Sequence, residues 1–147
     1  MTSWTHAPVF GSPPETEPAT VRPSAYAVVA DDADRIATVR TPQGVFLPGG
    51  GIEPGEDARD AVLREVLEEC GLDVQLGSWS VRAIDFVYSV TELQHFEKRA
   101  VFVDARPTVH RVTPTETDHE LVWMTVAEAV QRLTHPSHRW AVEQRHL

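Results

Sequence analysis

GGGIEPGEDARDAVLREVLEECGL, residues 49–72, is the stretch that decides the fold of this chain of 147 residues. Three glycines and a Pro-Gly pair predict a tight turn, and the apolar residues that follow recur at three- and four-residue spacing. That spacing predicts an amphipathic helix over residues 58–70. Gly71 lies where a helix that ends in the left-handed conformation favours glycine. The sequence therefore predicts a glycine-rich turn that leads into a helix with a defined end.

Three carboxylates share one face of this predicted helix, because Glu65, Glu68 and Glu69 stand at positions i, i+3 and i+4. Acidic residues on a helix usually form a solvated surface, but converging carboxylates are also the ligands that hard divalent cations favour. Arg64 adds a fork of donors that can orient one carboxylate and keep it ionised. Glycines let the backbone approach a ligand closely, so the turn and the acidic face predict a metal pocket between them. A metal held by carboxylates indicates phosphate chemistry.

At every defined position this stretch resembles the Nudix box, with Gly50, Glu56, Arg64, Glu65, Val66, Glu68, Glu69, Gly71 and Leu72 in place. The resemblance implies an α/β (α+β) fold, the Nudix-like α/β/α sandwich with a mixed β-sheet. It also implies a hydrolase of phosphorus anhydrides that uses Mg²⁺ or Mn²⁺. The reaction implied is hydrolysis of a pyrophosphate bond in a nucleoside diphosphate linked to another moiety. Nucleoside triphosphates, dinucleoside polyphosphates and nucleotide sugars all stay open as substrates.

The resemblance further implies roles for individual residues. The expected metal ligands are three carboxylates and one backbone carbonyl, those of Glu65, Glu68, Glu69 and Gly49. Glu56 is expected to support the metal site or its waters, and Arg64 to orient carboxylates. In many family members a glutamate of the box is the general base, which here would be Glu65 or Glu69.

Other family members take the general base from a later loop. The segment TETDHELVW, residues 115–123, carries three acids just before a predicted strand, and Glu120 is the first choice among them, with Glu97 the second. Tyr88 lies at the distance from the box at which dinucleoside polyphosphate hydrolases of the family carry a tyrosine. Tyr88 is therefore a candidate contact of the substrate base, although a strand tyrosine with its hydroxyl at the sheet edge is the more common reason for a tyrosine at such a position.

Regular elements are expected on both sides of the box. Strands are predicted at residues 24–30, 35–40, 45–47, 73–81, 83–90, 99–105 and 120–124, and further helices at 125–133 and 137–147, with Thr125 as an N-cap. Residues 1–20 are polar and Pro-rich, and predict an N-terminal arm that docks on its own body or on a partner subunit. Residues 21–147 predict a single Nudix hydrolase domain.

Composition restricts the partners. The net charge of −9 argues against binding of a nucleic-acid polymer, and no apolar run approaches the length of a membrane span. The N-terminus lacks a secretory signal, so a cytoplasmic location is expected. The expected partner is a small-molecule nucleotide, and the family and the arm together favour a homodimer. The seven histidines show no ligand spacing and are expected mostly at the surface.

Two other functions occur within the same family. A non-catalytic nucleotide-binding or regulatory Nudix module is one, but such modules usually lose acids of the box, and this chain keeps all of them. A Nudix isomerase of isoprenoid diphosphates is the other, and it would need a cysteine in the glycine region. The single cysteine of the chain, Cys70, lies on the apolar stripe of the predicted helix instead.

Overall fold

The computed structural model describes residues 4–147, and the first three residues of the predicted arm lie outside that range. In chain order the elements are β1 (Val9–Phe10), β2 (Thr20–Val29), β3 (Ile36–Thr41), β4 (Gly44–Phe46), β5 (Gly49–Gly51), α1 (Ala58–Cys70), β6 (Leu72–Ser89), β7 (Gln94–Arg111), β8 (Glu120–Met124), α2 (Val126–Arg132) and α3 (Pro136–Arg145).

The strands form a larger mixed sheet and a smaller antiparallel one. The larger sheet has the order β1-β6-β7-β2-β5, in which β1 pairs with β6 and β2 with β7 in parallel. The pairs β6–β7 and β2–β5 are antiparallel. The smaller sheet has the order β4-β3-β8. The predicted class, an α+β fold with a mixed sheet, is confirmed.

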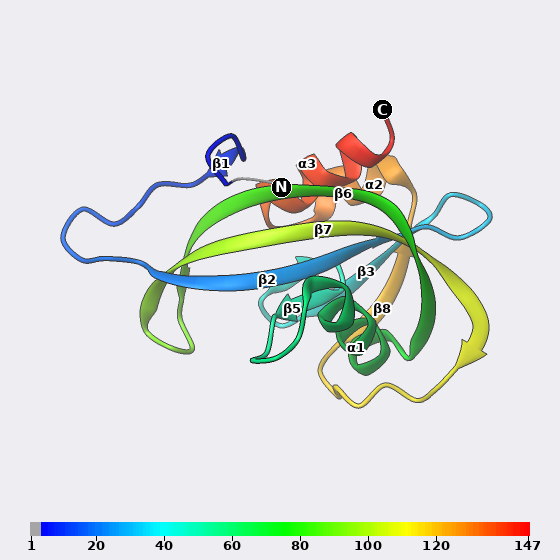
Figure 1. The fold of residues 1–147 in the computed structure, drawn as a ribbon. Helices are drawn as coiled ribbons and strands as arrows, with labels where there is room; N and C mark the ends of the chain where they lie inside the picture. The colour runs from blue at the N-terminus through cyan, green and yellow to red at the C-terminus, as the bar shows by residue number, and fades with distance from the viewer. Residues whose placement is uncertain (1–3) are drawn as a thin grey trace.

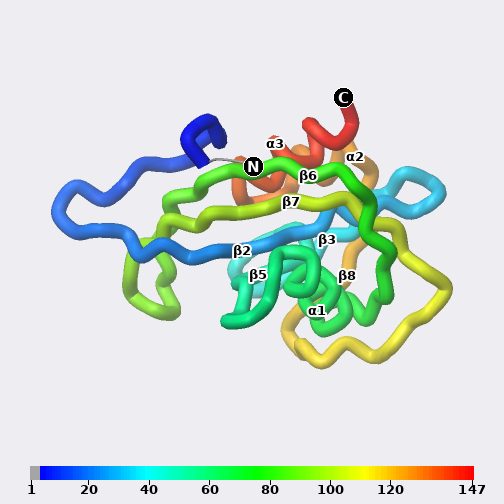
Figure 2. The backbone as a smooth tube through the Cα atoms, viewed as in Figure 1, coloured from blue at the N-terminus to red at the C-terminus, as the bar shows by residue number. Residues whose placement is uncertain are grey.

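Helix α1 lies on one side of the larger sheet, and α2 and α3 lie on the other (Figure 1). On the first side, Val62 and Val66 of α1 pack against Ala27 of β2. On the second side, Ala141 of α3 packs in a separate cluster with Phe102 of β7. Each fully buried valine stabilises the fold by roughly 1.5–3 kcal/mol, so the apolar face of α1 fixes where its acidic face lies. Figure 2 shows the long β6 and β7 curving together around α1.

Helix α1 begins and ends at the predicted residues. Asp57 is the N-cap, and its carboxylate accepts a hydrogen bond from the amide of Asp60 at 2.8 Å. Gly71 ends the helix with φ at +66°, and its amide donates to the carbonyl of Leu67 at 2.9 Å. A Cβ at position 71 would lie 2.0 Å from the carbonyl oxygen of Val112. Glycine is therefore required there both by conformation and by space.

The three glycines form a short edge strand, β5, and not the turn that the sequence predicted. This strand pairs antiparallel with β2, with Gly49 opposite Tyr26. A Cβ on Gly49 would lie 2.2 Å from the carbonyl oxygen of Ala25, and φ at this residue is +150°. By intrinsic propensity, glycine is disfavoured in β-strands. Here the close approach of two backbones requires it, which a single sequence does not reveal.

Two strands predicted on either side of Arg82 form one continuous strand, β6, and the predicted strand at residues 99–105 extends at both ends into β7. The register of β6 with β7 shifts instead at two places, between Leu72 and Val74 and between Leu76 and Ser80. Gly77 lies at the second of these shifts, and a Cβ there would come within 2.4 Å of the Asp104 carboxylate.

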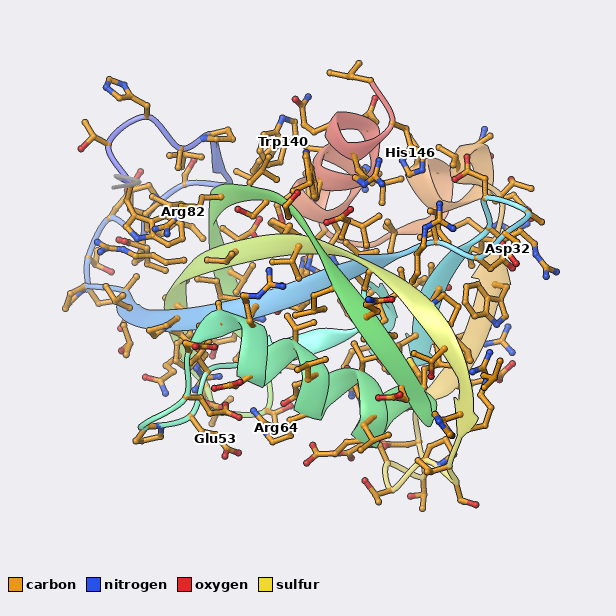
Figure 3. All side chains as sticks on the ribbon, turned by 45° about the vertical axis from the view of Figure 1, so that its right-hand side comes forward. Asp32, Glu53, Arg64, Arg82, Trp140 and His146 are labelled. Carbon is orange, nitrogen blue, oxygen red and sulfur yellow. The ribbon has the colours of Figure 1, made fainter. Side chains whose placement is uncertain are left out.

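The arm docks on its own chain. β1 pairs with β6, and the ring of Phe10 lies 6.1 Å from that of Trp140 on α3. The guanidinium of Arg82 lies 5.0 Å from the ring of Trp4. Figure 3 shows Arg82 and Trp140 on this side of the molecule. Because one chain accounts for the order of residues 4–19, the expected homodimer rests on the family resemblance alone.

The helices after β8 follow the sequence signals. Thr125 caps α2 with a capping box, in which its hydroxyl accepts from the amide of Glu128 and the Glu128 carboxylate accepts from the amide of Thr125. Pro136 begins α3, where a missing amide is tolerated. Among residues 4–147, no helix combines the length and the apolar character needed to cross a membrane.

We expect Gly71→Ala to lower the free energy of unfolding by about 1–3 kcal/mol, because an L-residue resists the left-handed conformation and the Val112 carbonyl must move. Urea denaturation followed by circular dichroism measures this. Gly55→Ala is a matched control, with φ at +85° but open space around the new Cβ, and Gly51→Ala has neither constraint. Equal losses for the three variants would contradict the role assigned to the Val112 contact.

Candidate active site

Arg64 contacts several carboxylates that the sequence places near the metal pocket. Its Nε and Nη2 donate to the two oxygens of Glu56 at 2.7 and 2.9 Å. Its Nη1 donates to Glu65 at 2.8 Å and to Glu68 at 3.4 Å. Figure 3 shows Arg64 on the same side of the molecule as Glu53, with which it forms an ion pair at 3.7 Å. Arg64 thus connects the loop before α1 to the acidic face of the helix.

Glu56 and Glu65 bind the same guanidinium, yet their pKa values shift in opposite directions. Hydrogen bonds from Arg64 lower the pKa of Glu56 to about 2. Burial raises the pKa of Glu65, although Arg64 acts against the rise. Both side chains are 17% exposed, so surface exposure does not explain the opposite pKa shifts. Glu65 lies against the glycine strand and has more protein around it, which removes more of its hydration. Arg64 therefore satisfies Glu56 but leaves Glu65 in need of further positive charge.

Glu69 is the most perturbed carboxyl of the site. It is 8% exposed, and one oxygen accepts a hydrogen bond from the amide of Gly49 at 2.8 Å. Burial raises the pKa of Glu69 to about 8, and the negative charges of Glu65 and Glu68 add to the rise, whereas the Gly49 amide opposes it. The second oxygen lies 3.4 Å from Nε2 of His119. A cation among these carboxylates would relieve both the burial and the repulsion.

The glycine strand completes the site through its backbone. A Cβ on Gly50 would lie 3.1 Å from the carboxylate carbon of Glu65, so glycine leaves that carboxylate its space. The carbonyl of Gly51 accepts a hydrogen bond from Arg64 at 3.2 Å. Together with the amide of Gly49, these contacts hold the acidic face of α1 against β5. The predicted use of the Gly49 carbonyl as a metal ligand stays a prediction.

His138 of α3 anchors the segment that leads into β5, and sequence reasoning missed it. Its Nδ1 accepts a hydrogen bond from the amide of Leu47 at 3.1 Å, and the side chain is 1% exposed. Burial lowers the pKa of His138 well below its usual value, which keeps Nδ1 free to accept. The histidines were expected mostly at the surface, but only His6 and His110 are exposed. His138 lies on α3, about 90 residues after the segment that it binds, so no local spacing in the sequence marks its role.

The late loop contributes His119 to the site. His119 contacts Glu69, and its Nδ1 lies 3.1 Å from Asp118. Ligand atoms of Glu116, Asp118 and His119 lie within 4.8 Å of one another, but both acids are exposed, and such clusters are common without an ion. His119 lies just before β8 (Glu120–Met124), and no spacing in the sequence marked it as a residue of the site.

The two predicted late-loop acids lie apart from the helix carboxylates. Glu120 forms a bidentate ion pair with Arg40 on the neighbouring strand β3, with Nη2 at 2.8 and 2.7 Å from its oxygens. Glu97 binds Arg99 at 2.8 Å. Their catalytic roles stay predictions, and an exposed pair such as Glu120–Arg40 contributes little to stability.

A groove leads away from Glu69. Its inner cavity, of about 270 Å³, is lined by Gly49, Glu69 and His119 at one end and by Lys98 and His135 at the other. An outer cavity, of about 420 Å³, shares Lys98 and His135 and continues to Tyr88. The ring of Tyr88 packs on His95 at 4.8 Å, and the residue is 49% exposed at the mouth of the outer cavity. The structure thus brings Tyr88 to the same groove as Glu69, at its far end.

The donor set fits a divalent cation. Glu65, Glu68 and Glu69 offer hard oxygen ligands on one helix face, and burial makes two of them costly to ionise without a counter-charge. Cys70, beside them, is buried, and burial raises the pKa of its thiol to about 12, so it stays a neutral core residue.

A family model of the NUDIX domain matches residues 20–145. The chain belongs to the NUDIX family. The match includes every strand of the two sheets except β1, and all three helices. The resemblance carried by the box is thereby confirmed over most of the chain.

Solved structures share this fold. A NUDIX hydrolase from Nitrosomonas europaea is 21% identical, with a TM-score of 0.68 over 86% of this chain and 89% of that one. A C. elegans Ap4A hydrolase in a binary complex is 16% identical, with a TM-score of 0.67 over 85% of this chain and 95% of that one. At these identities the likeness concerns the fold.

Curated relatives match a shorter stretch. A Bacillus subtilis (strain 168) protein provisionally named an 8-oxo-dGTP diphosphatase is 36% identical over 56 residues, 37% of this chain and 38% of that protein. Diphosphoinositol polyphosphate phosphohydrolase 3-alpha of Mus musculus is 36% identical over 73 residues, 43% and 44% of the two chains. The chain therefore spans less than half the length of these relatives.

We expect the stability of the metal-free protein to fall as the pH rises from about 4.5 to about 8, the ordinary and the folded pKa of Glu69. Between these values the folded state binds more protons than the unfolded state, so raising the pH favours unfolding. Thermal unfolding in EDTA, compared with Glu69→Gln, measures the contribution of this residue. Parallel pH profiles for the two proteins would contradict it. Added Mg²⁺ should stabilise the native protein more at pH 8 than at pH 5, because fewer protons then compete with the ion for Glu69.

Proposed function

We propose that this chain is a Mg²⁺- or Mn²⁺-dependent hydrolase of a pyrophosphate bond in a nucleoside diphosphate linked to another group. The observation that carries the proposal is the buried carboxylate of Glu69, held against the glycine strand with Glu65 and Glu68 beside it. Membership of the family and the phosphohydrolase names of two relatives support the same reaction class.

Glu65, Glu68 and Glu69, with the carbonyl of Gly49, are the residues proposed to hold the metal. When bound, the ion would neutralise phosphoryl oxygens and lower the pKa of a water molecule. Glu56 is proposed to support the metal site without binding the ion itself. It accepts two hydrogen bonds from Arg64, and no contact joins it to Glu69 among the interactions of residues 4–147.

Hydrolysis also needs a group of the chain that accepts the proton released by the attacking water. One water is consumed when its oxygen bonds to phosphorus and the bridging P–O bond breaks, with the electron pair leaving on the departing phosphate. Glu65 or Glu69 is proposed to accept the proton of the attacking water, because both carboxylates lie on the helix face proposed to hold the metal. Glu120 is the late-loop alternative, and its ion pair with Arg40 would have to open first.

The groove supports a nucleotide as substrate. Its inner cavity adjoins the carboxylates, and its outer cavity carries apolar and aromatic side chains that suit a base. Tyr88 is proposed as a contact of the base from the mouth of the outer cavity. The relatives' names include an inositol phosphate as well as a nucleotide substrate, so a nucleotide panel with an inositol pyrophosphate is the appropriate screen.

We expect Glu68→Gln and Glu69→Gln to lower kcat/KM on the order of 10²–10⁴-fold with the fold retained, because each removes a ligand or a base. Mass spectrometry of products from the panel, with Mg²⁺, Mn²⁺ or EDTA, measures turnover. Asp60→Asn is the matched control, because it removes one charge from an exposed position of the same helix. Full activity of both variants would overturn the proposal, and no turnover of any compound by the native protein would favour a binding module.

A further inference from the structure

Lys98 lies where the two cavities of the groove meet. Gln43, Phe46, Lys98 and His135 line both cavities, and Lys98 is the only residue among them that carries a full charge at neutral pH. Burial, together with the charge of Lys98, lowers the pKa of His135 to about 4 and keeps its ring neutral. The junction therefore has one positive group.

The position of Lys98 is set by the sheet. On β7 it lies opposite Asp85 of β6 and Arg22 of β2. It shares a face of the sheet with Phe96 and Ala100, two residues away on either side, and both are buried. The stem of Lys98 therefore rises from a packed surface, and the residue lines both cavities of the groove.

The ammonium of Lys98 is available to a ligand. Among residues 4–147 it forms no salt bridge, although its charge acts on the Asp85 carboxyl. Arg22, the other cation of the outer cavity, is already engaged: two hydrogen bonds join it to Glu92 at 3.2 and 2.8 Å, and it lies 3.8 Å above the ring of Phe96. An anion that enters the groove thus meets Lys98 as its first unpaired cation.

The two ends of the groove differ in chemistry. The inner end carries the carboxylates proposed to hold a metal, which attracts phosphoryl oxygens. The outer end carries Phe46, Val87 and Tyr88, which offer apolar and aromatic surface to a planar group. Lys98 lies between these ends, at the place where an anionic chain would connect them.

We propose that Lys98 binds the phosphate group nearest the nucleoside, and that the outer cavity takes the base. This inference rests on the proposed function and deepens it, because it orients the substrate. The base points toward Phe46 and Tyr88, and the group that is cleaved away lies at Glu69. Substrates of this class are elongated, with a planar group at one end of a polyphosphate chain.

A purely structural role for Lys98 would be to balance Asp85. That carboxyl is 3% exposed, and it accepts a hydrogen bond from the hydroxyl of Ser137 at 2.6 Å. Burial raises the pKa of Asp85, and Ser137 and Lys98 act against the rise. Asp85→Asn removes the charge that would need balancing, so the effect of Lys98 on a ligand is best measured in that background.

The test is calorimetric titration with tripolyphosphate and with the α,β-methylene analogues of ATP, GTP, CTP and UTP in Mg²⁺. We expect Lys98→Met, in the Asp85→Asn background, to weaken binding of the best analogue about tenfold or more, since a charge-assisted contact is lost. The salt dependence of binding should also become shallower, which a structural role would not cause. Lys98→Arg should keep part of the affinity.

Arg106→Met is the matched control. Arg106 lies on the same strand, is 67% exposed and pairs with Asp32 at 3.6 Å, away from the groove. It changes the net charge equally, so it should alter the Kd by less than about twofold. Equal affinities with and without Lys98, or no saturable binding of any probe by the native protein, would overturn the inference.

This experiment separates the two proposals. Binding is measured without turnover, so a loss of affinity on Lys98→Met in a protein that hydrolyses nothing would retain the inference and reject the hydrolase. Hydrolysis with an unchanged KM in the Lys98 variants would reject the inference and retain the hydrolase.

Discussion

The site depends on a carboxylate that is kept out of water. Glu69 is buried between α1 and β5 and receives one amide hydrogen bond, from Gly49, while other carboxylates stand beside it. Burying an ionised carboxylate in this way costs free energy, unless the group takes up a proton or binds a cation. Residue 49 must be glycine because β5 lies close to the backbone of β2, Gly50 leaves space for the Glu65 carboxylate, and α1 must dock by its apolar face. Catalytic potential and fold are therefore constrained by the same contact.

The pKa values of the site's carboxyls depend on burial as much as on neighbouring charges. Arg64 gives hydrogen bonds to both Glu56 and Glu65, and the two carboxyls have the same exposed fraction, yet the pKa of one falls and that of the other rises. The loss of hydration at Glu65 outweighs the attraction of a guanidinium that Glu56 already engages through two hydrogen bonds. One arginine thus favours the ionised form of Glu56 but does not offset the burial of Glu65.

Segments distant in sequence complete the site, and they come from both sides of the larger sheet. His138 of α3 accepts a hydrogen bond from the segment before β5. The groove is lined by residues from β4, β7 and the start of α3. These contacts place His138 in the interior, although no spacing in the sequence marked it. A ligand in the groove would contact elements that fold together only when both faces of the larger sheet are covered.

The sequence by itself determined the helix, its ends and its acidic face, because the cap residues, apolar period and box spacing are local properties. It also determined the fold class and the family, since residues 49–72 carry the whole motif. Only the tertiary structure decided that the glycines form a strand, that β6 is continuous, and that His119, His138 and Lys98 face the site while Glu120 pairs with Arg40. These outcomes depend on which backbones pair and which side of a strand faces inward. Such long-range choices leave no spacing in the chain from which they can be read.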